Sequence, residues 1–207
     1  ETMGRKLQIT RGMIIDSAFE LLHKCGPEAL TYRRIADAAG CSTQPVAWQF
    51  DSIENLKKEL LVKVLRHLDE QTAPRQEDKD KNAVVKYYNL ICRRLDFVIK
   101  ETNLTDFLRT NGHSVPVEQI LSSQSQKAMI EELSTELSLP IENVRELCTK
   151  LIIFGHGFYS LICTGALQIS LEDAHRYMLE NMLSQIVSYL PKNTPQSIHN
   201  LKQQYFS

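Results

Sequence analysis

The stretch LTYRRIADAAGCSTQPVAWQF, residues 30–50, decides the fold that the sequence predicts. Thr31 is suited to cap a first helix, and Gly40 can adopt the left-handed conformation that ends one. Ser42 or Thr43 can then begin a second, short helix. A helix, a tight turn and a second helix form the arrangement that presents the second helix to the DNA major groove. A compact helical hairpin with small residues at its crossing would give the same local pattern.

The second helix has two faces with different expected roles. Its inward face is predicted to consist of apolar residues, namely Val46, Ala47 and Phe50. Its outward face is predicted to carry polar side chains, namely Thr43, Gln44 and Gln49. Pro45 restricts Gln44 to extended conformations and removes an amide donor, so we expect the second helix to begin at Pro45 and to be very short.

Helical patterns flank this stretch on both sides. The segment from Thr10 to Lys24 has a helical apolar stripe formed by Ile14, Ala18, Leu21 and Leu22. Downstream, Asp51-Ser-Ile-Glu54 matches a capping box and opens a long helix. The apolar side of that helix is formed by Leu56, Leu60, Leu61, Val64, Leu65 and Leu68.

The block from about Ile9 to Leu68 resembles the DNA-binding domain of the TetR/AcrR family of transcriptional regulators. The resemblance is carried by Leu22-His-Lys-Cys-Gly26, by the run from Leu30 through Ile35-Ala36 to Ala39-Gly-Cys-Ser42, by Phe50 and by Glu54-Asn-Leu56. It covers some sixty residues with the family's internal spacing. It implies a ligand-responsive regulator, typically a repressor, that binds a palindromic DNA operator as a homodimer.

The chain departs from the family pattern at two positions where phosphate contacts are expected. Ala47 stands where the family usually has an aromatic residue, and Ile53 stands where it usually has a lysine. We expect Trp48 to face the DNA backbone in place of the missing aromatic. The expected DNA-binding residues are Thr31, Arg33, Arg34, Ser42, Thr43, Gln44, Trp48, Gln49 and Lys57. Gln44 and Gln49 are expected to pair with adenine edges, and the arginines and Lys57 with phosphates.

The composition predicts an all-α protein. The chain has 207 residues, of which 43% are hydrophobic, and its eight glycines and seven prolines are too few for a turn-rich β fold. We expect an N-terminal three-helix helix-turn-helix DNA-binding domain at residues 1–51. A larger helical ligand-binding and dimerisation domain is expected at residues 52–207, in which residues 52–70 form the connecting helix. The net charge of −1 excludes a grossly basic coat protein, but Arg5, Lys6 and Arg11 are expected to form a basic mobile arm.

No catalytic set is recognisable, so the chain is not expected to be an enzyme. The six histidines lack carboxylate or cysteine partners at ligand spacing, and there is no glycine-rich phosphate loop, so no metal and no cofactor are expected. Five widely spaced cysteines without a Cys-x-x-Cys pair suit a reducing cytoplasm. No apolar run is long enough to span a membrane, and no membrane partner is expected.

The rest of the chain is predicted to be helical apart from a polar surface connection at residues 69–82. Helices are expected at residues 83–101, 105–109, 117–137, 140–166 and 171–190, and the third of these has a polar middle that indicates either a kink or an exposed edge. Ser170-Leu-Glu-Asp173 matches a helix cap. Gly155 and Gly157 inside a helix indicate either a close approach of a neighbouring helix or a kink beside a ligand cavity.

The last two of these helices resemble the pair through which TetR-family subunits form a four-helix bundle. The expected dimer interface consists of Leu151, Gly155, Phe158, Ile162, Met178, Met182 and Ile186. Such a dimer would place two reading helices about 34 Å apart, or somewhat more, on one face of DNA.

A small-molecule effector is expected to bind among Leu65, Tyr88, Cys92, Phe107, His113, Phe154 and Phe158. The apolar lining favours a mostly hydrophobic, aromatic molecule, although the same residues could fill a core. A second function class stays open from the sequence, namely a helical ligand sensor or interaction protein with this fold that has weak or no operator binding. Ala47 and Ile53 motivate that alternative.

Overall fold

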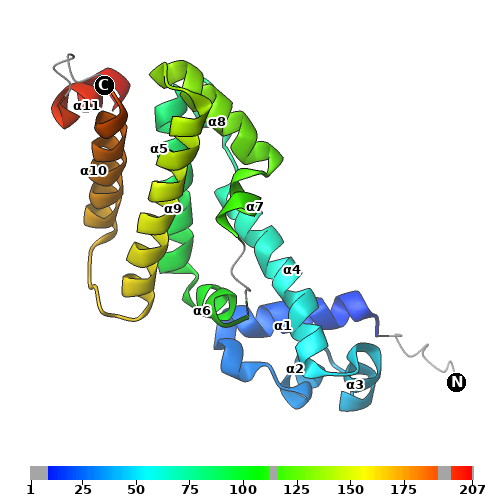
Figure 1. Cartoon of the computed structure of the whole chain (residues 1–207). Helices are drawn as coiled ribbons and strands as arrows, with labels where there is room; N and C mark the ends of the chain where they lie inside the picture. Colours follow the sequence, from blue (N-terminus) through cyan, green and yellow to red (C-terminus); the bar gives the residue numbers. More distant parts are fainter. Residues whose placement is uncertain (1–8, 112–115, 191–196, 207) are drawn as a thin grey trace, which may run out of the picture. The chain divides into compact units, whose positions relative to one another are not determined.

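The structure, a computed structural model, describes residues 9–111, 116–190 and 197–206, and every regular element in these ranges is a helix (Figure 1). The prediction of an all-α protein is therefore confirmed. The described chain divides into two compact units. Unit 1 comprises residues 9–70 and 101–111, and unit 2 comprises residues 71–100, 116–190 and 197–206.

Unit 1 contains α1 (Arg11–Cys25), the short 3-10 helix η1 (Pro27–Ala29), α2 (Tyr32–Ala38), α3 (Thr43–Phe50), most of α4 (Ile53–Thr72) and α6 (Thr102–Asn111). The helix α1 packs against α2, α3 and α6. It begins where the sequence indicates, because the side chain of Thr10 accepts a hydrogen bond from the amide of Met13 at 3.2 Å. The core of unit 1 consists of fully buried residues from α1 to α4, namely Ile14, Ala18, Leu22, Ile35, Ala36, Val46, Phe50, Leu56, Leu60 and Val64.

The turn between α2 and α3 follows the predicted chemistry. The Thr31 hydroxyl accepts a hydrogen bond from the Arg34 amide at 3.3 Å, and Gly40 has the predicted left-handed backbone with φ 66°. The helix α3 begins at Thr43 and has Ser42 as its N-cap residue, as one of the two predictions has it, and the predicted start at Pro45 is wrong. Pro45 occupies the first turn, where its missing amide would have had no partner within the helix, so Gln44 is helical and α3 has eight residues.

The division into two units differs from the expected domain boundary between residues 51 and 52. Most of α4 belongs to unit 1, because its Lys63 forms an ion pair with Asp16 of α1 and Leu60 is fully buried. The helix α6 also belongs to unit 1. Its Asn103 amide donates to the His23 carbonyl at 2.8 Å, and the adjacent Glu101 pairs with the His23 ring at 2.6 Å.

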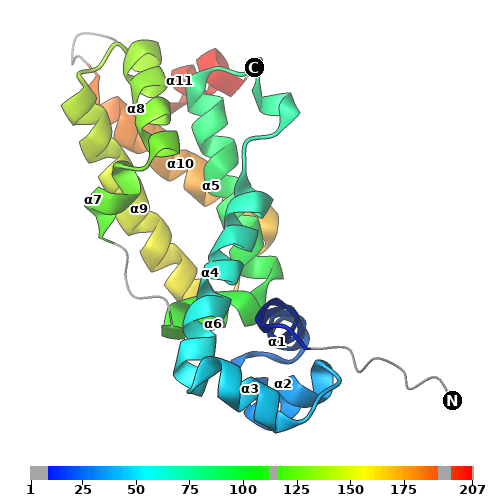
Figure 2. The same cartoon turned by 90° about the vertical axis from the view of Figure 1, so that its right-hand side faces the viewer.

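Unit 2 contains the short η2 (Gln76–Asp78), α5 (Ala83–Lys100), α7 (Val117–Leu121), α8 (Gln124–Leu137), α9 (Ile141–Cys163), α10 (Leu171–Tyr189) and α11 (Ile198–Phe206). The helices α5, α9 and α10 run side by side, and α8 packs against α5 and α9 (Figures 1 and 2). The predicted kink is a break between α7 and α8 at Ser122 and Ser123. As predicted, Ser170 caps α10 by accepting a hydrogen bond from the Asp173 amide at 3.1 Å.

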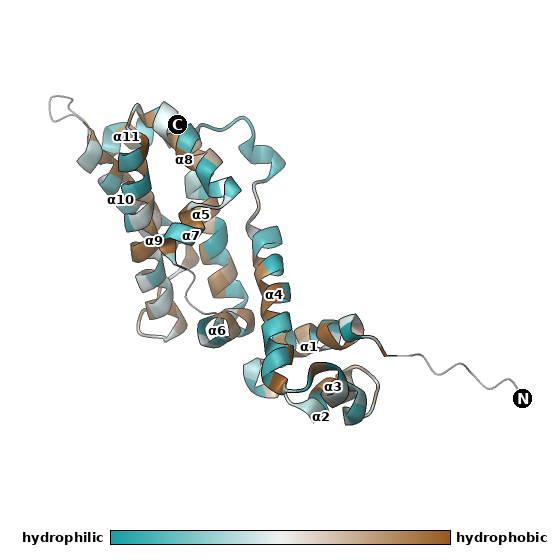
Figure 3. Cartoon of the chain, turned by 45° about the vertical axis from the view of Figure 1, so that its right-hand side comes forward, coloured by the Kyte–Doolittle hydropathy of each residue, from teal (hydrophilic) through white to brown (hydrophobic). Residues whose placement is uncertain are grey.

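The helices of both units are amphipathic, and hydrophilic and hydrophobic residues lie side by side along them (Figure 3). In unit 2 the apolar faces form one core, which includes Val84, Leu95, Leu133, Val144, Leu147, Ala174, Leu183 and Leu201. None of the helices in the described residues has the length and apolar content needed to cross a membrane.

The segment at residues 69–82 is not only a surface connection, which corrects the prediction. The helix α4 continues to Thr72, and the side chain of Asp78 is only 4% exposed. Asp78 forms an ion pair with Arg93 at 2.9 Å and accepts hydrogen bonds from the Arg75 amide at 2.7 Å and from Asn89 at 2.8 Å. This polar segment therefore contains a buried anchor, Asp78, whose side-chain partners Asn89 and Arg93 lie on α5.

Candidate DNA-binding interface and helix pair

The exposed face of α3 is the candidate DNA-reading surface of unit 1. Val46 and Phe50 are 0% and 1% exposed and hold the helix on the unit, whereas Trp48 on the opposite side is 82% exposed. Thr43 and Gln44 are exposed as predicted. Ala47 is also exposed, which corrects its predicted inward position, since the eight-residue helix turns only Val46 and Phe50 fully inward.

Gln49 does not lie on this exposed face, contrary to the expectation that it reads adenine. Its side-chain amide donates a hydrogen bond to the Ile9 carbonyl at 3.1 Å, and the residue is half-buried. The side chain is therefore used to hold the segment before α1 against the end of α3. Thr31 is exposed, and its hydroxyl already caps α2.

Arg11 is part of the scaffold that positions α3 and is not an arm residue. Its Nε lies 2.9 Å from both carboxylate oxygens of Glu59, and a terminal guanidinium nitrogen donates to the Gln49 carbonyl. The guanidinium also lies 4.3 Å from the ring centre of Phe50. The hydrogen bond with Glu59 raises the pKa of Arg11 and lowers the pKa of Glu59. Local sequence gave no signal of this role, because Glu59 is 48 residues away. Arg5 and Lys6 lie outside the described residues.

The remaining cationic candidates lie at the ends of neighbouring helices. Arg33 and Arg34 are exposed in the first turn of α2, and Lys57 is half-buried in the first turns of α4. No ion pair within the described residues occupies any of these three side chains. Ser42 precedes α3 and is exposed, although its hydroxyl makes no capping hydrogen bond. These groups are therefore available to phosphates.

The residues predicted to bind an effector are divided between the two units. Leu65 and Phe107 belong to unit 1, where Leu65 is 39% exposed and Phe107 is fully buried. In unit 2, the Tyr88 hydroxyl donates to the His175 carbonyl at 3.3 Å, and burial raises the pKa of the Cys92 thiol to about 11. His113 lies outside the described residues. Helical spacing identified apolar faces, but these faces fill cores.

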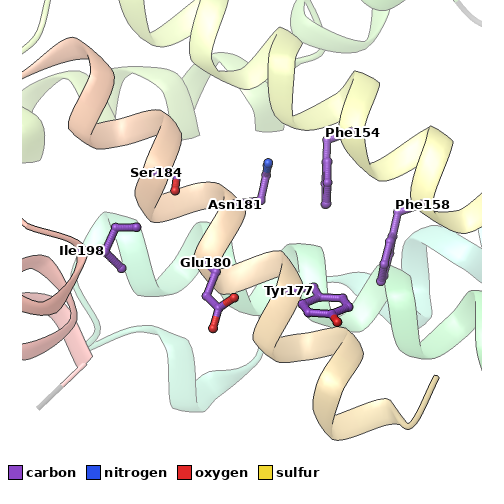
Figure 4. A pocket seen from close by; sticks show the side chains of 7 residues that line it. All are labelled: Phe154, Phe158, Tyr177, Glu180, Asn181, Ser184 and Ile198. Carbon is purple, nitrogen blue, oxygen red and sulfur yellow. The ribbon is translucent and has the colours of Figure 1, made fainter.

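Only Phe154 and Phe158 of that set line a described cavity, an open groove of about 660 Å³ beside α9 and α10. Figure 4 shows the two rings of α9 extending toward α10, and their centres are 5.7 Å apart in a stacked arrangement. Tyr177 packs its ring edge against Phe158. Asn181 also lines the groove, and its Oδ1 is buried without a hydrogen-bond partner among the described residues.

The residues predicted to form the dimer interface are packed inside unit 2 instead. Leu151, Phe158, Met178, Met182 and Ile186 are between 1% and 7% exposed and belong to the core of the unit. Gly155 is buried as well, and Ile162 is half-buried against the same core. An apolar stripe with helical spacing is compatible with an intramolecular core and with a dimer contact. The residues predicted from this stripe therefore turned out to lie on the inner side of the two helices.

The outer side of the same helix pair carries different apolar residues. On α9, Ile153 is 63% exposed and Leu161 is 49% exposed, and Gly157 lies one turn from each. On α10, Tyr177 is 42% exposed. We call Ile153, Gly157, Leu161 and Tyr177 the outer apolar face. A Cβ atom added at Gly157 would meet nothing within 4 Å, so no contact within the protomer requires glycine at this position.

Within the described residues, no group of three or more histidine, cysteine or acidic side chains is arranged to hold a metal ion. Burial also raises the pKa of the Cys148 thiol, which disfavours the thiolate form.

Comparisons with known proteins agree with this geometry. Residues 14–60 match the family model of the bacterial regulatory proteins of the tetR family. No curated protein matches the sequence. A tetR-family transcriptional regulator from Streptomyces coelicolor has a similar fold, with a TM-score of 0.63 and 15% identity over 94% of each chain. A TetR transcriptional regulator from Rhodococcus sp. RHA1 aligns with a TM-score of 0.51 and 17% identity, over 87% of this chain and 99% of that chain.

The matched residues cover most of α1, all of α2 and α3 and the first part of α4, and the similarity of fold extends over nearly the whole chain. Residues 14–60 therefore match the tetR family of bacterial regulatory proteins, and the fold of the chain is similar to that of TetR-family regulators.

Proposed function

We propose that the protein is a ligand-responsive transcriptional repressor that binds a palindromic DNA operator as a homodimer. The observation that carries the proposal is the exposed face of α3, on which Trp48, Thr43 and Gln44 project from a helix anchored by buried Val46 and Phe50. Arg33, Arg34 and Lys57 supply cations for the phosphates beside such a groove contact. Trp48 replaces, one position further along, the aromatic that the family pattern has at Ala47.

A homodimer places two copies of α3 on one DNA face. We assign the contact between the two subunits to the outer apolar face of α9 and α10. It presents apolar side chains to solvent, and the groove beside it leaves the buried Asn181 Oδ1 unpaired. An effector bound in unit 2 would then change the spacing between the two copies of α3 in the dimer. Tenfold weaker DNA binding requires the effector to favour the released state by about 1.4 kcal/mol.

The test is titration of the purified protein onto the DNA upstream of its own gene at several salt concentrations. Six phosphate contacts in a dimer predict that log K falls with log salt with a slope of about −5. A shuffled duplex of equal length is the control, and it should bind more weakly by at least about a thousandfold. Equal binding to both duplexes, or none at low salt, would favour the alternative of a sensor or interaction protein without operator recognition.

Gln44→Ala is expected to weaken operator binding by about tenfold or more and to relax sequence preference at one base pair in each half-site. The reason is that a glutamine amide can pair with both polar atoms of an adenine edge, which is worth about 1–3 kcal/mol. Arg33→Ala should instead weaken all sequences alike and make the salt slope shallower by about one per subunit. The measurement is fluorescence anisotropy on operator variants.

The matched control for Gln44→Ala is Gln124→Ala, which removes the same side chain from an exposed position at the start of α8. This control should leave operator affinity unchanged. Unaltered affinity and base preference in Gln44→Ala would show that α3 does not read the operator through this residue.

A further inference from the structure

A second cavity, of about 60 Å³, lies within unit 2 among α5, α7, α8, α9 and α10. It shares no residue with the open groove of Figure 4. Most of its wall is apolar, as shown by Leu90, Ile91 and Leu151, and no acidic residue lines it. Such a cavity binds a small molecule when a few polar groups converge on an otherwise apolar wall.

Besides Tyr87 and His156, three further polar side chains line this wall. They are the Arg94 guanidinium of α5, the Tyr159 hydroxyl of α9 and the amide oxygen Oε1 of Gln126 on α8. Gln126 is only 6% exposed, and its Oε1 is buried. Buried polar atoms are nearly always paired in folded proteins, so the buried and unpaired Oε1 of Gln126 indicates a partner that comes from outside the chain. The half-buried Arg94 and Tyr159 lie on the same cavity wall.

The charges at the cavity favour an anion. Arg94 is half-buried, and within the described part of the chain no carboxylate lies at ion-pair distance from it. Burial raises the pKa of Tyr159 to about 12, against the opposite effect of nearby Arg94, so the phenol stays protonated at neutral pH and can donate a hydrogen bond. A guanidinium and a phenol supply donors only to an anion, and a carboxylate accepts hydrogen bonds from both.

We propose that this cavity binds a short-chain carboxylate that also carries a hydrogen-bond donor such as a hydroxyl group. The carboxylate accepts from Arg94 and Tyr159, and the hydroxyl group donates to the orphaned Oε1 of Gln126. The small volume of about 60 Å³ limits the ligand to a few carbon atoms. Naming this ligand the effector rests on the proposed function, whereas binding itself does not.

The experiment is an NMR titration of the protein without DNA, following the backbone amides of Gly155 and Gln126, with lactate as the probe. We expect saturable binding with a dissociation constant of about 1 mM, as is reasonable for so small a molecule. Propionate, which lacks the hydroxyl group, should bind several-fold more weakly. Lactamide and propylammonium, which lack the negative charge, should not saturate at tenfold higher concentrations.

Three variants test the assignment of the groups. Arg94→Gln should weaken lactate binding at least tenfold, whereas Lys127→Gln, which makes the same charge change at an exposed position of α8, should not. Gln126→Leu should bind lactate and propionate equally. Gly155→Ala adds a methyl group to the cavity wall at an ordinary 3.6 Å from the Tyr159 ring. This last variant should lose lactate while its melting temperature rises by about 3 °C, because alanine favours the helix.

Because the melting temperature of Gly155→Ala is expected to rise, a loss of lactate binding in this variant cannot be caused by unfolding. Lactamide binding as tightly as lactate, or undiminished binding in Arg94→Gln, would overturn the anion site, and so would the absence of saturable binding by wild type. Equal affinities of the wild type for lactate and propionate would show that Gln126 does not bind the hydroxyl group of the ligand. Because no DNA is present, these outcomes are independent of operator binding, and adding lactate to the operator titration tests the effector role separately.

Discussion

Arg93→Met is expected to lower the free energy of unfolding by about 3–5 kcal/mol, since it leaves the carboxylate of Asp78 buried without its cation. The side chains of Arg93 and Asp78 are 11% and 4% exposed, and their ion pair is 2.9 Å long. Arg93 also lies 3.4 Å from the Thr72 carbonyl through its Nε, so the substitution frees the end of α4 as well. Urea denaturation followed by circular dichroism measures the loss.

Two controls separate the buried pair from a general effect of removing arginine. Arg109→Met breaks an exposed ion pair with Asp106 and should cost less than about 1 kcal/mol. The double variant Asp78→Leu/Arg93→Met replaces the buried charges by apolar groups, and it should be more stable than Arg93→Met alone. Equal stability of Arg93→Met and Arg109→Met would contradict the assignment of Asp78 as a buried anchor.

The same group gives a pH signature. Burial raises the pKa of Asp78, but hydrogen bonds from Arg75 and Asn89 and the charge of Arg93 outweigh it, so its pKa lies below the ordinary value of 3.8. A carboxyl group with a depressed pKa in the folded state contributes stability above its unfolded pKa and loses it as pH falls through the folded value. Below about pH 4 the wild type should therefore lose stability more steeply than Asp78→Asn, which has no carboxyl group at this position.

Leu161→Asp is expected to convert a dimer into a monomer and to reduce operator affinity by at least about a hundredfold. Leu161 is 49% exposed on the outer apolar face, so a charge there is solvated in the monomer and desolvated only in the dimer. Sedimentation at micromolar concentration should give twice 23.7 kDa for the wild type and 23.7 kDa for the variant. Charges at Met182 or Phe158 would unfold the unit instead, because both side chains lie in its core.

The matched control is Val62→Asp, which places the same charge at a position of α4 that is 68% exposed. It should leave the sedimentation of the dimer unchanged. Gly157→Ala is a finer probe, because the added methyl group meets nothing within the protomer and favours the helix. This variant should be more stable as a monomer and less tightly dimeric, and a wild-type monomer or a dimeric Leu161→Asp would exclude the outer apolar face.

A structural feature of this protein could be predicted from the sequence when the residues that determine it lie close together in the chain. The caps at Thr31 and Ser170 and the left-handed turn at Gly40 were predicted correctly, because each depends on a backbone group within a few residues. Helical periodicity likewise located α1, α5, α9 and α10 to within a few residues. The prediction that α3 begins at Ser42 or Thr43 is confirmed, and the prediction that it begins at Pro45 is wrong because proline fits the first turn of a helix.

The sequence by itself therefore determined the main helices, their caps and the resemblance of residues 14–60 to the tetR family. Only the tertiary structure decided which face of each helix is covered. It placed Gln49 and Arg11 in contacts with residues some 40 positions away, buried Asp78 beneath α5 and turned the periodic stripe of α9 and α10 inward. The physical reason is that an apolar stripe or a charged side chain specifies that a partner is needed, whereas the partner is supplied by residues distant in the chain.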